Sequence, residues 1–155
     1  MRYPPRTALA CAFVFCVTPP LPAQTAPDRP AILAVITRLF DGMRRGDSAM
    51  VRSAFHPRAS LTTAVVRQGK ATVTFDDVET FLRAVGTPHD SVWDERITNE
   101  VVHQDGTLAV VWTDYRFYVG DRFSHCGVDA FQLAKEDGEW KITALADTRR
   151  KQGCE

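Results

Sequence analysis

The sequence lacks the compositional marks of several protein classes. It has 19 basic and 19 acidic side chains among 155 residues and no basic block, so nucleic acid is a poor candidate partner. It also has no glycine-rich phosphate loop, and neither of the metal-site spacings Cys-x-x-Cys and His-Glu-x-x-His occurs. We therefore expect no metal site and no cofactor.

No apolar run is long enough to span a bilayer, which takes about 20 residues. Residues 1–23 have instead the pattern of a secretory signal peptide: Arg2 and Arg6, a short apolar run over residues 8–17, and a proline-rich end before Ala23. A membrane-anchoring helix is the alternative. We predict cleavage after Ala23 and export to the periplasm or the extracellular medium, with no membrane attachment afterwards. Residues 24–155 then form one mature domain, as their number suggests.

Cysteine is scarce, and only Cys126 and Cys154 lie outside the predicted signal peptide. In the simplest strand pairing Cys126 faces Arg149, so the tail must fold back before Cys154 can reach it. Gly153 permits this reversal, and an oxidising compartment preserves disulfides. A Cys126–Cys154 disulfide and two free thiols both remain open at this point.

The N-terminal half of the mature chain has the apolar spacing of helices. Apolar residues between Ile32 and Met43 recur at helical spacing, Asp28 is a candidate N-cap, and Gly46 ends the segment. Asp47 begins a second, shorter helix, and Asp76 or Asp77 begins a third. A short β-hairpin over residues 61–75 precedes that third helix.

The rest of the chain has the composition of β-strands. Strands over residues 91–103, 107–119, 122–134 and 139–150 are separated by the turn signals Asp105-Gly106, Gly120-Asp121 and Asp137-Gly138. Helices followed by an antiparallel meander predict an α+β fold, with three helices packed on one face of a mostly antiparallel sheet.

Two-residue turns without bulges predict how the strands pair. Trp112 then faces Asp129 and Asn99, Asp114 faces Gly127, and Arg116 faces His125. The helices would cover Leu108, Val110, Phe131, Leu133 and Ile142 on this face. The opposite face, with Ala109, Val111, Val128, Ala130 and Leu145, would be a homodimer interface or an exposed face. A single β-bulge would exchange the faces of a strand.

The polar end of the first face is the predicted mouth of a pocket. Asp114, Asp129 and His125 are candidate catalytic residues, because a carboxylate in an apolar pocket has a raised pKa and histidine titrates near neutral pH. The alternative is a polar network, or a pocket that only binds, in which arginines pair with the carboxylates. Predicted ligand-contacting residues are Asn99, Trp112, Arg116 and Phe131. Trp112 and Phe131 would stack on a small hydrophobic or aromatic molecule, or belong to the core.

Three segments resemble the nuclear transport factor 2-like superfamily. They are the run from Leu39 to Asp47, the sequence Phe55-His56-Pro57 before a strand, and Trp140-Lys141-Ile142 leading to Ala146-Asp147. The SnoaL-like and lumazine-binding branches are the most similar. The resemblance implies a cone-shaped fold with a pocket between a curved sheet and the helices, often dimeric through the outer sheet face. The superfamily includes isomerases, dehydratases and cyclases as well as members with no known reaction, so no catalytic role carries over.

These observations predict an exported, dimeric small-molecule-binding domain with an unknown ligand. The alternative is a lyase, isomerase or cyclase that uses pocket Asp and His residues as general acid and base. A protein-interaction module that binds through its sheet is a third, weaker hypothesis.

Overall fold

The computed structural model describes residues 26–154, so the predicted signal peptide, residues 1–23, lies outside the described residues. The elements follow the predicted order. They are helices α1 (Arg29–Arg45) and α2 (Ser48–Ala54), strands β1 (Phe55–Arg67) and β2 (Lys70–Asp77), helix α3 (Val78–Gly86), and strands β3 (Trp93–Asp105), β4 (Leu108–Val119), β5 (Arg122–Glu136) and β6 (Glu139–Arg149). No helix among residues 26–154 has the length and apolar character needed to cross a membrane.

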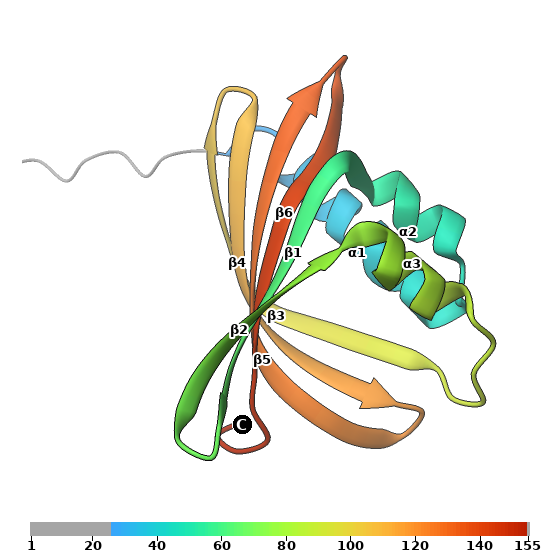
Figure 1. The fold of residues 1–155 in the computed structure, drawn as a ribbon. Helices are drawn as coiled ribbons and strands as arrows, with labels where there is room; N and C mark the ends of the chain where they lie inside the picture. Colours follow the sequence, from blue (N-terminus) through green and yellow to red (C-terminus); the bar gives the residue numbers. More distant parts are fainter. Residues whose placement is uncertain (1–25, 155) are drawn as a thin grey trace, which may run out of the picture.

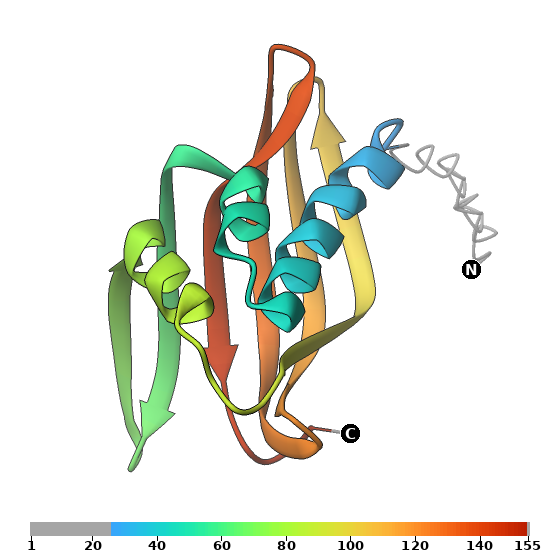
Figure 2. The same ribbon diagram turned by 90° about the vertical axis from the view of Figure 1, so that its right-hand side faces the viewer.

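The strands form a six-stranded sheet in the order β2-β1-β6-β5-β4-β3. Strand β1 runs parallel to β6, and the other neighbours are antiparallel. All three helices lie on one side of the curved sheet (Figure 1, Figure 2). The predicted α+β fold class is therefore confirmed. We call the side that faces the helices the inner face and the opposite side the outer face.

The predicted helix boundaries have local causes in the structure. Gly46 ends α1 in the left-handed conformation, at φ 64°. Asp47 and Asp77 cap α2 and α3 by accepting hydrogen bonds from the backbone N–H groups of Met50 and Thr80. Asp28 makes no such cap on α1. Its carboxylate accepts instead from Lys135 Nζ at 2.9 Å and from Trp140 Nε1 at 3.1 Å, and so ties the start of α1 to the sheet.

The core lies between the apolar stripe of α1 and the inner face of the sheet. Phe131, Leu133 and Ile142 are buried there, as predicted. Leu108 and Val110 were expected in the same core, but they lie on the outer face and are 46% and 43% exposed. The strand register explains this difference.

A β-bulge in the central hairpin shifts its register by one residue. Next to the turn the pairing is as predicted, with Tyr118 opposite Phe123. Ser124 is then an extra residue in β5, so Phe117 pairs with His125 and every pair beyond it is shifted by one residue. Asp129 therefore faces Thr113 and not Trp112, and Arg116 faces Cys126 and not His125. Since side chains alternate between faces, one extra residue places Trp112, Asp114 and Arg116 on the outer face, whereas the inner face was predicted for them.

Two further irregularities act in the same way. Asn99, with φ 60°, lies in a break of the β3–β4 register between Thr98 and Val101, and Ile97 then pairs with Tyr115. Between β5 and β6 the predicted pair Leu133–Ile142 is confirmed. Beyond it the register shifts by one, so Asp129 lies opposite Asp147 and not Ala146.

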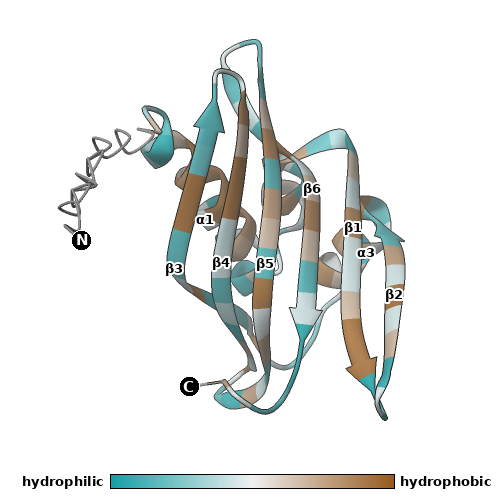
Figure 3. Ribbon diagram, turned by 90° about the vertical axis from the view of Figure 1, so that its left-hand side faces the viewer, coloured by the Kyte–Doolittle hydropathy of each residue, from teal (hydrophilic) through white to brown (hydrophobic). Residues whose placement is uncertain are grey.

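The residues predicted for the homodimer face are consequently correct only in part. Val128 and Ala130 lie on the outer face as predicted, since they alternate with the buried residues Asp129 and Phe131. Ala109 and Val111 instead point inward and are almost fully buried, and Leu145 lines the cavity. Apolar segments of β3 and β4 are coloured brown in Figure 3, and four of their apolar residues are exposed on the outer face. These, which we call the outer patch, are Val101, Leu108, Val110 and Trp112, and the Trp112 side chain is 56% exposed.

Candidate functional site

A cavity of about 270 Å³ opens between helices α1 and α3 and the inner face of the sheet. One end is apolar, and the other end is lined by ionisable groups that come from β3, β4, β5 and β6. The apolar lining residues are Leu39, Phe40, Met43, Leu61, Phe81, Ala84 and Leu145, and the polar ones include Glu95, Tyr115, His125, Asp129, Asp147 and Arg149.

The structure separates the predicted site residues into two groups. Asp129 and His125 line the cavity. Phe131 is buried beside it in the core, where its ring meets Phe40 edge to face at 6.2 Å between centroids. The other predicted residues, Asn99, Trp112, Asp114 and Arg116, lie on the outer face, against the prediction that one face holds all seven.

Two of the displaced residues still contact each other on the outer face. Asn99 Nδ2 donates to Asp114 Oδ2 at 2.9 Å. With Arg116 and Cys126 they line a separate, more polar hollow. Asp114 therefore cannot share a reaction centre with Asp129, because the sheet lies between them.

Four residues of the polar end were missed as site residues by the sequence interpretation: Glu95, Tyr115, Asp147 and Arg149. The unbulged pairing placed Tyr115 and Asp147 on the face opposite Asp129 and assigned Glu95 to neither face. Tyr115 alternates in phase with Val111 and Thr113, so a correct inward assignment of Val111 would have placed Tyr115 inward as well. Nothing in the sequence gives the position of the bulge that brings Asp129 to the same side.

Gly127 allows β4, β5 and β6 to approach closely at this end. A Cβ atom at Gly127 would lie 1.7 Å from the carbonyl oxygen of Thr148 and 2.7 Å from a ring carbon of Tyr115. Without it, the Tyr115 hydroxyl donates to the Thr148 carbonyl at 2.8 Å. Glycine at this position therefore places the Tyr115 ring at the cavity wall.

Asp129 is the least accessible acid of the site. It is 2% exposed, and its Oδ2 atom is fully buried with no hydrogen-bond donor among the described residues. Burial raises the pKa of this carboxyl well above its ordinary value, and the neighbouring Glu95 and Asp147 raise it further. Burial likewise raises the pKa of Glu95 to about 7. The pair therefore keeps at least one proton at neutral pH, and a hydrogen bond between the two carboxyls requires that proton to be shared.

Asp147 has a different environment, because a cation and two hydroxyl groups surround it. Arg149 Nε donates to Asp147 Oδ2 at 2.6 Å, Thr63 Oγ1 donates to Oδ1 at 2.5 Å, and the Tyr115 hydroxyl lies 3.4 Å from Oδ2. The Arg149–Asp147 contact is a charge-assisted hydrogen bond, which is stronger than one between neutral groups. Arg149 is therefore neutralised by Asp147 and leaves the charge of the Glu95–Asp129 pair unbalanced.

His125 and Tyr115 are neutral groups at the edge of the cavity. Burial and the positive charge of Arg149 lower the pKa of His125, so its ring is uncharged at pH 7. Its Nδ1 atom lies 3.0 Å from Ser124 Oγ, and its ring lies edge-on to Tyr115. Burial and the surrounding carboxyls raise the pKa of Tyr115, which stays protonated and acts as a hydrogen-bond donor.

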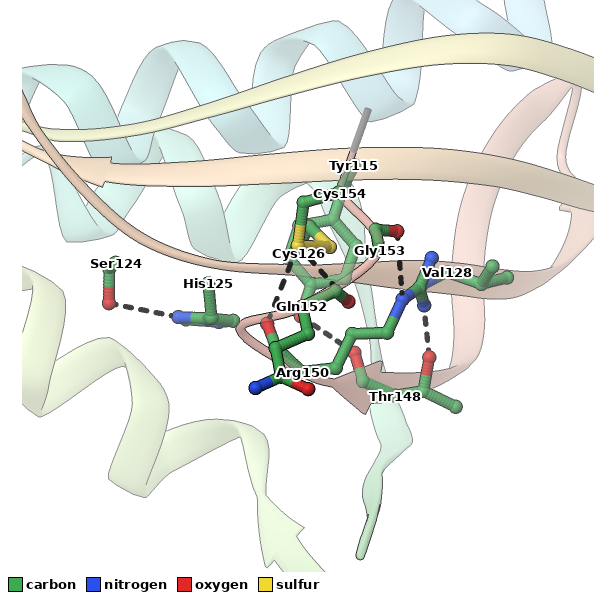
Figure 4. Close-up of a disulfide and its surroundings, with 10 residues drawn as sticks. All are labelled: Tyr115, Ser124, His125, Cys126, Val128, Thr148, Arg150, Gln152, Gly153 and Cys154. Carbon is green, nitrogen blue, oxygen red and sulfur yellow. Dashed lines mark hydrogen bonds between the residues drawn. A yellow bond between two sulfur atoms is a disulfide. The ribbon is translucent and has the colours of Figure 1, made fainter.

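The chain beyond β6 is held next to this polar end by a disulfide between Cys126 and Cys154, whose Cα atoms are 5.8 Å apart. Of the two open alternatives, the structure has the disulfide. Cys126 pairs with Arg150 and not with Arg149, through two backbone hydrogen bonds of 2.9 Å. Figure 4 shows the tail folding back so that Gly153 and Cys154 lie near Cys126 and the Tyr115 ring. The disulfide therefore fixes the end of β6, which carries Asp147 and Arg149.

No group of three or more His, Cys, Asp or Glu side chains among residues 26–154 is arranged to hold a metal ion. Since Glu95 and Asp129 share a proton and Asp147 is paired with Arg149, the three carboxyls do not present a common set of ligands.

Comparison with known proteins identifies the fold and the family. A family model described as "Putative lumazine-binding" matches residues 27–145. No curated relative matches the chain. Among solved structures, a protein of unknown function from Mycobacterium tuberculosis has a TM-score of 0.66 at 14% identity, covering 81% of this chain and 73% of its own.

Two further structures are similar to a comparable degree. A nuclear transport factor 2-like protein of unknown function from Shewanella baltica has a TM-score of 0.63 at 17% identity, covering 84% of this chain and 99% of its own. A protein from Novosphingobium aromaticivorans described as "Putative Scytalone Dehydratase" has a TM-score of 0.62 at 16% identity, with coverages of 79% and 84%. At these identities the likeness shows the fold alone. By the family match, the chain belongs to the family described as "Putative lumazine-binding", and it has the fold of nuclear transport factor 2-like proteins.

Proposed function

We propose that this chain is an exported small-molecule-binding domain whose ligand occupies the cavity between α1, α3 and the inner face of the sheet. One observation carries the proposal: the Oδ2 atom of Asp129 is buried without a donor at the polar end of a cavity whose other end is apolar. An unpaired buried polar atom costs free energy, about 1–3 kcal/mol, and native proteins rarely keep one without a role. A ligand that supplies the missing partner gives Asp129 such a role.

The shape of the cavity supports the same proposal. Ligand sites are typically concave and mostly apolar, with a few polar groups that fix the orientation of the ligand. Here α1 and α3 supply Leu39, Phe40, Met43 and Phe81 to the walls, and the strands supply the polar end. The lining favours a molecule with an apolar body and one polar end.

Filling the cavity from its wall tests this proposal. Ala84 lines the cavity and is exposed, so Ala84→Phe is expected to block the cavity without creating a core defect. Ala71, an exposed alanine of β2 outside the cavity lining, provides the matched control Ala71→Phe. In an NMR titration with a panel of one-ring fragments, we expect shifts of the Glu95, Tyr115 and Asp129 amides in the parent and in Ala71→Phe, and loss of those shifts in Ala84→Phe. Binding that survives in Ala84→Phe, or shifts confined to the outer face, would contradict the proposal.

Proton transfer by the Glu95–Asp129 pair is a second candidate function. The observation that favours it is the raised pKa of both carboxyls, which places a shared proton at a cavity wall near neutral pH. This corresponds to the lyase, isomerase or cyclase alternative from the sequence, in which Glu95 now replaces Asp114 as a candidate acid–base residue. The measurement is exchange of the α-hydrogens of small ketones in D₂O. We expect Asp129→Asn to abolish it and the outer-face control Asp114→Asn to retain it, and equal exchange in both variants would contradict the assignment.

Export and a homodimer complete the proposal. The pattern of residues 1–23 supports export, and so does the disulfide, since such bonds persist in oxidising compartments. The outer patch supports a homodimer, because it places four apolar side chains next to one another on a sheet face that none of the helices among residues 26–154 covers.

A further inference from the structure

The charges around the cavity are not balanced. The ionisable groups around Asp129 come from β3, β4, β5 and β6. They are Glu95, Tyr115, His125, Asp147 and Arg149. Asp76 of β2 also lines the cavity. Arg149 is the only cation of this set, and it binds Asp147. Tyr115 and His125 are neutral at pH 7. As Glu95 ionises around pH 7, because its pKa is about 7, the Glu95–Asp129 pair keeps one proton and gains one negative charge that has no partner among the described residues.

The backbone does not supply a partner for that charge either. The helices α1 and α3 contribute Leu39, Phe40, Met43, Thr80 and Phe81 to the cavity lining, and none of these side chains is a cation. Arg44 is near β3, but its guanidinium contacts Asp41, Asp94 and the backbone oxygen of Glu95 rather than the Glu95 carboxyl. A buried negative charge without a cation or donors is costly. The missing component is therefore a positively charged group that enters from the cavity.

We infer that the cavity binds a protonated amine with an apolar, one-ring body, whose ammonium group lies at the Glu95 and Asp129 carboxyls. This inference rests on the proposed ligand-binding function and specifies the class of ligand. An ammonium group has three N–H donors, enough for Asp129 Oδ2 and for the Glu95 carboxyl. The body then contacts Phe40, Met43 and Phe81. A cavity of about 150 Å³ holds benzene, so the 270 Å³ present here admits a ring with a short amino-alkyl chain.

The ammonium group favours the ionised form of Glu95, and this has a measurable consequence. An alkylamine is fully protonated at pH 7, as lysine is. Its charge stabilises the form of the Glu95–Asp129 pair that has one proton and one negative charge, so the fraction of Glu95 that is still protonated releases its proton to solvent when the amine binds. Binding therefore tightens as the pH rises from about 6 to 8. A neutral ligand at the same place would release no proton.

The experiment is isothermal titration calorimetry with three probes of matched size: 2-phenylethylamine, 2-phenylethanol and phenylacetate. Titrations at pH 7 in buffers with different ionisation enthalpies give the number of protons released. We expect the amine to bind at least about 10-fold more tightly than the alcohol, phenylacetate not to bind, and a proton to be released with the amine alone. Asp129→Asn is expected to weaken amine binding by about 10- to 100-fold, as a lost charged hydrogen bond does, and to abolish proton release.

Two controls separate loss of the site from loss of the fold. Glu95→Gln removes the other carboxyl and is expected to have the same direction of effect, and Asp114→Asn on the outer face is expected to leave amine binding unchanged. Circular dichroism checks that each variant is folded. Equal binding of the alcohol or the acid, or amine binding that both Asp129→Asn and Glu95→Gln leave unchanged, would overturn the amine inference and leave the cavity as a binding site. Failure of all three probes to bind in the cavity would overturn the inference together with the proposed function.

Discussion

At the scale of single residues, Asp129 shows how a site can depend on a group that the core tolerates poorly. Its neighbours Phe131 and Thr113 are fully packed, and a carboxylate between them has lost its hydration. The adjacent Glu95 carboxyl makes ionisation of Asp129 harder still, because like charges at short range repel. Sharing one proton lowers both costs. The pair therefore links the stability of the domain to pH.

The sign of that link follows from the raised pKa values of Glu95 and Asp129. Between about pH 5 and pH 8 the folded chain keeps a proton that the unfolded chain has lost, so the free energy of unfolding falls as the pH rises. The slope is at most about 1.4 kcal/mol per pH unit for each retained proton. Asp129→Asn is expected to flatten it and to make the domain at least as stable as the parent at pH 8.

Urea unfolding at intervals between pH 6 and pH 8.5 measures this slope. The pKa of His125 is lowered by burial and changes stability in the opposite direction, but it is present in both proteins and cancels in their difference. Parallel curves for the parent and Asp129→Asn would show that the pair does not retain a proton.

At the scale of elements, the sheet decides which side chains reach the cavity. The extra residue Ser124 in β5 and the break at Asn99 in β3 act on the two sides of β4. Together they place Glu95, Tyr115, His125 and Asp129 on the inner face. They also leave Val110 and Trp112 of the same strand β4 on the outer face, where no helix covers them.

A substitution in the outer patch tests the proposed dimer at this scale. Val110→Glu places a charge in the outer patch and is expected to shift a dimer to monomer, because a buried, unpaired charge opposes association. Val92, 50% exposed in the loop before β3, provides the same change away from the patch, and Val92→Glu is expected to remain dimeric. Sedimentation at micromolar concentration gives the oligomeric state. A parent protein that is monomeric there, or a Val110→Glu variant that stays dimeric, would refute an interface at the outer patch.

At the scale of the whole molecule, the disulfide connects the proposed export to the site. It joins β5 to the tail over a separation of 28 residues, and Cys126 is only 2% exposed. A loop of this length stabilises a protein by about 3–4 kcal/mol in the chain-entropy model. Because Asp147 and Arg149 lie just before this closure, its loss would also loosen the polar end of the cavity.

The corresponding prediction concerns the exported protein and a single variant. The intact mass of the exported chain is expected to match residues 24–155 with one disulfide. Cys154→Ser is expected to lower the free energy of unfolding by about 3 kcal/mol, and it leaves Cys126 as a buried thiol that the core accommodates. The parent under reducing conditions is the control and should match the variant. A chain that retains residues 1–23, or that contains two free thiols, would contradict the prediction.

The local elements could be predicted from the sequence because their causes are local. The caps at Asp47 and Asp77, the end of α1 at Gly46 and the turn at Gly120 depend on residues a few positions away. The site could be predicted only in part. Asp129 and His125 line the cavity as expected, whereas Asp114, Arg116, Asn99 and Trp112 do not. All four displaced residues come from β4 or from the irregular part of β3, where the register shifts.

What the sequence by itself determined is the order of the elements, the α+β class and the resemblance to one superfamily, because apolar periodicity and turn residues specify these directly. Only the tertiary structure decided which face each strand presents to the helices. Side chains of a strand alternate with a period of two, so each one-residue bulge reverses every assignment beyond it. No local pattern in the sequence marks the bulges at Ser124 and Asn99. The pairing of Glu95 with Asp129, from which the proposed amine site follows, was therefore decided by the folded sheet.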